Sequence, residues 1–104
     1  MWIFLNNAFL SVVDKGDATG KTLLVRARRL KDITRVFPQA DVKADLGTDY
    51  RFRARIDREE LALRMADLVR GIDYGNFKSG VEEQDRHDAY LKVWSAMFRF
   101  QETE

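Results

Sequence analysis

The sequence predicts an α+β fold: an antiparallel sheet of four to five strands with two longer helices packed on one face, and one short helix. One observation behind this is the strict alternation of apolar and cationic residues in Tyr50–Ile56, which has the period of a β-strand. The other is a helical spacing of apolar residues after Asp57 and again after Ser79. Strands early in the chain and helices late in it favour a segregated α+β arrangement.

Length and composition limit what the chain can be. With 104 residues and 45% apolar content, residues 1–104 are expected to form a single domain. A chain of this size buries about 60 to 70% of the surface that its unfolded form exposes, which leaves little room for an enclosed substrate cavity. We therefore expect no small-molecule substrate and no enzymatic activity. The absence of cysteine excludes disulfides and thiolate chemistry and fits a reducing compartment.

The apolar segment 1–13 is expected to form a β-hairpin. Asn6-Asn7 separates two β-prone runs, and asparagine tolerates the positive φ that two-residue turns demand. This turn would place Phe4 opposite Phe9 and Ile3 opposite Leu10, with apolar residues on both faces. The segment lacks a basic start and a cleavage site and is shorter than a membrane span, so we expect a cytoplasmic protein without membrane contact.

Between the hairpin and the alternating strand, the pattern predicts a polar loop, a strand, a short helix and a short strand. The loop, 14–21, resembles a phosphate-binding loop, but three residues instead of four separate Gly16 from Gly20-Lys21. A strand over 22–28, not a helix, follows it, so we interpret it as a hairpin loop. The short helix begins at Leu30 and stops before Pro38, and the short strand spans 41–44.

Two capping patterns predict the starts of the longer helices. Asp57 is followed three residues later by Glu60, and Ser79 by Glu82. The first helix would extend to about Ile72 and the second to about Gln101. Their apolar faces are expected to cover the sheet, with Tyr50, Phe52, Leu23 and Val25 packed against Met65, Val69, Trp94 and Phe98.

The candidate binding surface is the sheet face that carries the arginines, which we name the arginine face; its members are Arg26, Arg28, Arg51, Arg53 and Arg55. Because the net charge is only +1, affinity for nucleic acid would depend on this local segregation of charge. Tyr50 and Phe52 are expected to point inward, leaving no aromatic side chain for base stacking. Alternatively, the arginines pair with acids such as Asp41, Asp45 and Glu59 on a solvated face.

A second, weaker candidate site surrounds His87, the one histidine of the chain. Glu83 precedes it by one helical turn, and Tyr74 lies in the turn before the last helix. A histidine beside a carboxylate is typical of a general base, but a helix-packing histidine hydrogen-bonded to Glu83 or to the backbone explains the pattern as well. A zinc site would need carboxylates alone besides His87, so we expect no metal, no cofactor and no catalytic residues.

Short segments spread over nearly the whole chain resemble a set of small bacterial and bacteriophage proteins. They are Met1–Ile3, Phe9–Val13, Leu24–Arg28, Asp49–Ala54, Ile72–Lys78 and Tyr90–Trp94. The most distinctive is Asp73–Lys78, Asp-Tyr-Gly-Asn-Phe-Lys. The resemblance implies a bacterial or phage origin and carries no activity, cofactor or catalytic residue to this chain.

Together these features predict a small non-enzymatic binding module of bacterial or phage origin that acts through a protein partner, in a regulatory or counter-defence role. A homodimer formed through leftover apolar surface of the hairpin is one form of this hypothesis. The alternative is nonspecific nucleic-acid binding through the arginine face. A small enzyme centred on His87 is the second alternative.

Overall fold

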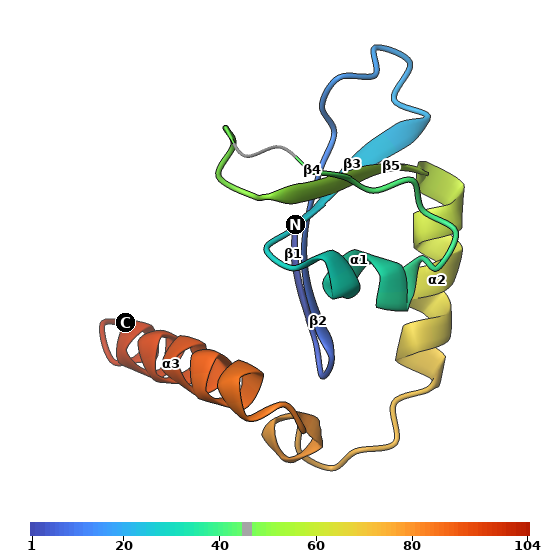
Figure 1. The fold of residues 1–104 in the computed structure, drawn as a ribbon. Coiled ribbons are helices and arrows are strands. Elements are labelled where there is room, and N and C mark those ends of the chain that lie inside the picture. Colours follow the sequence, from blue (N-terminus) through green and yellow to red (C-terminus); the bar gives the residue numbers. More distant parts are fainter. Residues whose placement is uncertain (45–46) are drawn as a thin grey trace. The chain divides into compact units, whose positions relative to one another are not determined.

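A computed structural model of the chain describes residues 1–44 and 47–104. These residues divide into two compact units, Met1–Ile72 and Asp73–Glu104. The first unit contains the sheet and the helices α1 and α2, and the second contains the short helix η1 and the helix α3 (Figure 1).

The sheet is antiparallel throughout, which confirms the predicted α+β class. Its order is β1-β2-β3-β5-β4, with the strands β1 (Trp2–Leu5), β2 (Ala8–Val13), β3 (Thr22–Ala27), β4 (Lys43–Ala44) and β5 (Phe52–Asp57). The predicted hairpin register is confirmed, with Phe4 opposite Phe9 and Ile3 opposite Leu10. The positive φ expected for the asparagines of the turn, Asn6-Asn7, is wrong. Among the described residues, only Gly16 and Gly20 have a positive φ.

The helices are α1 (Leu30–Val36), α2 (Arg58–Arg70), η1 (Lys78–Gly80) and α3 (Gln84–Gln101). The first ends before Pro38, as predicted. Asp57 is the N-cap of α2, also as predicted, but its side chain makes no capping hydrogen bond. The start predicted at Ser79 is wrong: Ser79 lies in η1, and α3 begins after the N-cap Glu83.

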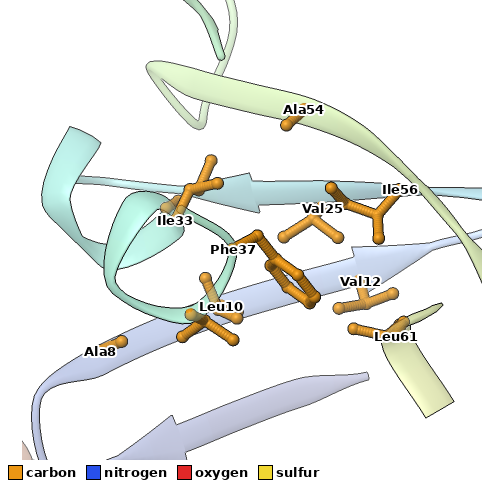
Figure 2. Close-up of a cluster of buried hydrophobic side chains, with 11 residues drawn as sticks. Ala8, Leu10, Val12, Val25, Ile33, Phe37, Ala54, Ile56 and Leu61 are labelled. Atoms are coloured by element: carbon orange, nitrogen blue, oxygen red, sulfur yellow. The ribbon is translucent and has the colours of Figure 1, made fainter. Parts of the chain in front are cut away.

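One face of the sheet is the hydrophobic core. Alternate residues of β2, β3 and β5 point to this face, where α1 covers them and the first turns of α2 add Leu61 (Figure 2). The buried members are Ala8, Leu10, Val12, Val25, Ala27, Ile33, Val36, Phe37, Ala54, Ile56 and Leu61. This cluster explains why the short helix, with apolar residues at three- and four-residue intervals, is stable at a length of seven residues.

Of the two predicted core partners in α2, one is confirmed and one is wrong. Met65 packs against the cluster, but Val69 is 66% exposed. Ile33 and Phe37, in and directly after α1, fill much of the space above the sheet. A short helix directly after β3 reaches the sheet with almost no loop, so less chain entropy opposes its packing.

Polar contacts attach α1 to its neighbours. Asp32 is 2% exposed, and its Oδ2 accepts a hydrogen bond from the Phe9 backbone N–H at 2.9 Å. Arg35 donates to the Asn7 carbonyl at 2.7 Å, and Arg64 of α2 donates to the Val36 carbonyl at 3.0 Å. Because a buried carboxylate is costly without donors, these bonds favour one placement of the β1–β2 hairpin relative to α1.

Candidate functional site

The strand register places a continuous row of side chains on the face opposite the core. Trp2 pairs with Ser11, Ser11 with Arg26, Arg26 with Arg53, and Arg53 with Lys43. Residues paired directly across antiparallel strands project to the same side of the sheet. The row therefore crosses all five strands, from an aromatic residue on β1 to three cations on β3, β5 and β4.

The predicted arginines gather around this row. Arg55 lies opposite Leu24 on the same face as Arg53, and Arg28 follows the end of β3. Arg51 is exposed and directly precedes β5. Lys43 was not predicted as a member; its place became visible only when β4 was paired with β5.

Aromatic side chains share the arginine face, which the sequence analysis missed. Phe4 and Phe9 stack with ring centroids 4.6 Å apart, and Trp2 meets Phe9 edge-on at 6.2 Å. The opposite side chains of β1, Ile3 and Leu5, pack on the core. The hairpin register was predicted correctly, but the pairing of β2 with β3 was needed to assign these rings and the arginines to one face.

The predicted burial of Tyr50 is confirmed, but its predicted place in the core beneath the helices is wrong. Its ring lies under two guanidinium groups, with Arg26 Cζ at 4.7 Å and Arg28 Cζ at 4.2 Å from the ring centroid. Residues 50 and 51 form a bend, and the extended alternation begins only at Phe52. Phe52 does pack on the core, as predicted. Because Tyr50 is 5% exposed, it supports the arginines and offers no surface for stacking.

Neutral oxygen atoms, more than carboxylates, accept hydrogen bonds from the arginine face. Arg26 donates to Ser11 Oγ at 2.8 Å, and Arg55 donates to Thr22 Oγ1 at 3.2 Å and to the Lys15 carbonyl at 3.0 Å. Arg28 pairs with Asp49 at 3.1 Å. Within the part of the chain that the structure describes, no carboxylate forms an ion pair with Arg26, Arg51, Arg53 or Arg55.

The two described acids that were predicted to pair with these arginines, Asp41 and Glu59, form no ion pair with them among the described residues. Asp41 pairs with Lys43 at 3.1 Å, and Glu59 lies exposed in the first turn of α2. Asp45 lies outside the described residues. The face therefore keeps a local excess of positive charge although the whole chain has a net charge of only +1.

This excess has an energetic cost. Arg26 and Arg53 lie directly opposite each other, as do Arg53 and Lys43, and like charges in such positions destabilise a sheet. The Nε atoms of Arg26 and Arg53 are also buried and have no hydrogen-bond partner among the described residues. A bound anion would relieve the repulsion between these cations.

A hollow of about 370 Å³ lies at the cationic end of the row. It is lined by Leu24, Asp41, Lys43, Arg53, Ala54 and Arg55. Three of these side chains are cationic, and the one carboxylate is bonded to Lys43. An anionic group is the ligand that this lining favours.

Comparisons of the chain with models of protein families, with curated proteins and with solved structures find no match. Within residues 1–44 and 47–104, no group of three or more histidine, aspartate or glutamate side chains is placed to hold a metal ion. No helix in the same residues combines the length and apolar character needed to cross a bilayer.

The second candidate site is not assembled as a catalytic group. The Glu83 carboxylate accepts a hydrogen bond from Arg86 Nε at 3.1 Å, and Tyr74 packs edge-on against Phe77. His87 Nδ1 is buried, accepts or donates no hydrogen bond within residues 1–44 and 47–104, and lies 4.0 Å from Asp88 Oδ1. The predicted side-chain bond from His87 to Glu83 is wrong, because the buried Arg86 takes that carboxylate.

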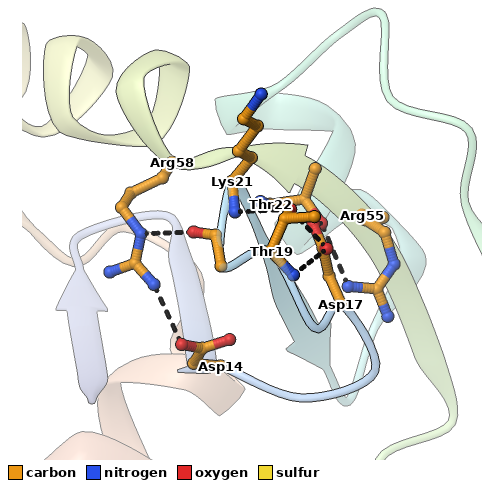
Figure 3. A network of polar contacts seen from close by, with 8 residues as sticks. Asp14, Asp17, Thr19, Lys21, Thr22, Arg55 and Arg58 are labelled. Carbon is orange, nitrogen blue, oxygen red and sulfur yellow. Dashed lines mark hydrogen bonds and ion pairs between the residues drawn. The ribbon is translucent and has the colours of Figure 1, made fainter.

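The loop between β2 and β3 is held by a carboxylate at its centre (Figure 3). Asp17 accepts hydrogen bonds from the backbone N–H and hydroxyl of Thr19 at 2.9 and 2.6 Å, and from those of Thr22 at 3.0 and 2.6 Å. Arg58 braces the loop by donating to the Gly20 carbonyl and pairing with Asp14. Amides that a phosphate-binding loop would use for its ligand are occupied here, which agrees with the predicted structural role.

The pKa of Asp17 is held far below its usual range by the hydrogen bonds from Thr19 and Thr22. Since the folded-state pKa is below the unfolded value of about 4, the ionised group stabilises the fold above about pH 4, and this contribution is lost as the pH falls further. We predict that Asp17→Asn lowers the free energy of unfolding at pH 7 and weakens its decline below pH 4, measured by urea unfolding. Asp57→Asn, at an exposed carboxyl that makes no capping hydrogen bond, is the control; equal curves for both variants would contradict the role given to Asp17.

The repulsion in the cationic row also gives a test. We predict that Arg53→Gln raises the free energy of unfolding by about 0.2 to 1 kcal/mol at low ionic strength, because it removes the cation between Arg26 and Lys43. Arg53→Lys keeps the charge and should give no such gain. Added salt should reduce the difference between the two variants, because it screens the repulsion. If Arg53→Gln lowered the free energy of unfolding more than Arg53→Lys does, repulsion between the cations of the row would not destabilise the sheet.

Proposed function

We propose that this protein binds nucleic acid without sequence preference, through phosphate contacts made by the arginine face. The observation that carries the proposal is the row Arg26, Arg53 and Lys43, three cations on neighbouring strands of which the two arginines have no carboxylate partner among the described residues. Guanidinium groups bind phosphate oxygens in a planar, bidentate manner, so arginine suits this ligand better than lysine does.

The arrangement of the cations supports a polymeric anion over a small one. Arg53 and Arg55 are two residues apart on β5, which separates them by about 6.7 Å, and neighbouring strands are about 4.8 Å apart. The charges are therefore spread as a two-dimensional array and do not converge on one point. A chain of regularly spaced phosphates neutralises several of them together and releases counterions as it does so.

We predict that the double variant Arg51→Ala with Arg53→Ala binds a labelled oligonucleotide more weakly in fluorescence anisotropy at low salt. If both arginines contact phosphates, the slope of log K against log salt should become shallower by about 1.4 on a single strand, or 1.8 on a duplex. The matched control is Arg70→Ala with Arg99→Ala, which removes the same charge from exposed positions on α2 and α3. No binding by the unmodified protein, or the same loss in both double variants, would remove the proposal.

A second candidate function is a protein contact, favoured by the exposed apolar face of α3. Trp94 and Phe98 stack with centroids 5.5 Å apart, and these two residues with Met97 and Phe100 are between 48 and 68% exposed. Apolar groups gathered in this way are uncommon on the surface of monomers. We infer that the partner is a second copy of α3, because two amphipathic helices can bury their apolar faces against each other.

We predict that sedimentation velocity shows a concentration-dependent dimer and that Phe98→Glu shifts it to monomer, because a buried, unpaired carboxylate opposes association. Glu104→Gln, a charge change at the end of the chain beyond α3, is the control. A monomer at every concentration would contradict this second candidate and leave the arginine face unaffected.

A further inference from the structure

The arginine face has two chemically distinct ends. Trp2, Phe4 and Phe9 lie on β1 and β2, while Arg26, Arg53 and Lys43 lie on β3, β5 and β4. Phosphate binding alone accounts for the cations and gives no reason for aromatic rings on the face opposite the core. Core packing does not account for them either, because α1 covers the opposite face.

Trp2 is the ring best placed to receive a ligand. Its side chain is 68% exposed, and its contact with Phe9 is edge-on, with an interplanar angle of 76°. Phe9 is in turn fixed by its stack with Phe4. A large ring that is held in place by a neighbour while most of it stays in water is suited to stack with another planar group.

The separation of the two ends suits a short run of nucleotides. Trp2 and Arg53 belong to the same cross-strand row and are three strand spacings apart, which is about 14 Å. Between them lies Ser11, whose hydroxyl accepts a hydrogen bond from Arg26. A flexible polynucleotide can therefore place a base on Trp2 while phosphates a few residues along the strand reach Arg53 and Lys43.

We propose that the ligand of this face is single-stranded nucleic acid, with bases stacked on Trp2 beside the Phe4–Phe9 pair and phosphates bound by the cations. The inference rests on the proposed function and narrows it to one class of nucleic acid. Bases in a duplex are already stacked on each other and offer only their edges, whereas those of a single strand present their faces. Tyr50, covered by Arg26 and Arg28, positions guanidinium groups and takes no part in stacking.

The test compares three labelled probes of equal strand length at low salt: oligothymidine, an abasic single strand with the same backbone charge, and a duplex. Oligothymidine should bind most tightly, and Trp2→Ala should weaken it about 5- to 150-fold, the effect of one stacked base. The same substitution should leave binding of the abasic strand unchanged. Phe100→Ala, at an equally exposed aromatic residue of α3, is the matched control.

A spectroscopic readout separates stacking from a loss of folding. The chain has two tryptophans, so Trp94→Phe leaves Trp2 as the sole tryptophan. Oligothymidine should then quench its fluorescence in a saturable manner, and the abasic strand should not. Equal affinity for oligothymidine, the abasic strand and the duplex, with Trp2→Ala without effect, would overturn this inference and leave phosphate binding intact.

Two further outcomes concern the function on which the inference rests. If none of the three probes binds at low salt, the proposed function fails and the inference fails with it. If polyglutamate displaces oligothymidine at an equal concentration of charges, the face recognises acidic polymers in general, and the assignment to single-stranded nucleic acid is overturned.

Discussion

The pairing of Ser11 with Arg26, and of Arg26 with Arg53, is the constraint on which the rest of the molecule's first unit depends. Side chains alternate along each strand, so the register that buries Leu10, Val25 and Ala54 also decides what the other face displays. A shift by one residue would exchange the two faces, exposing the core and burying guanidinium groups. The cationic surface is thus maintained by the same hydrophobic burial that stabilises the sheet.

The two faces of the sheet are covered and supported by different groups. A helix of seven residues covers the core side, with the buried Asp32 and with Arg35 bonded to the backbone of the β1–β2 hairpin. On the other side, the guanidinium groups are supported by Tyr50, Ser11 and backbone carbonyls. Neutral partners leave the positive charge of the arginines in place, whereas carboxylates would cancel it. Tyr50, Ser11 and the backbone carbonyls therefore orient the guanidinium groups without weakening their attraction for an anion.

Local patterns were enough to predict much of this fold. The hairpin register, the stop of α1 before Pro38 and the inward direction of Phe52 each depend on a few neighbouring residues. Tyr50 was assigned to the wrong face because the alternation in the sequence begins two residues before the extended backbone does. The start of α3 was misplaced because Ser79 lies inside the 3₁₀ turn Lys78–Gly80, and the helix begins after Glu83.

Only the arginines of the candidate site could be predicted from the sequence, and the cause differs from that of the errors in the fold. The arginines follow from periodicity within two strands, but their relation to Trp2, Phe4 and Phe9 depends on which strands are neighbours. Strand order is a long-range property, set by competition among many pairings, and a period of two contains no information on it. The same holds for Lys43, since a strand of two residues has almost no period to detect.

The short length of β4 affects how the protein can aggregate in concentrated solution. It is the last strand of the sheet on its side, and strands in this position offer unpaired backbone groups to neighbouring molecules. A strand of two residues offers few of them, and its lysine must be desolvated before another chain can align there. Growth of fibrils through this edge is therefore disfavoured by the same short, charged segment that completes the hollow beside Arg53.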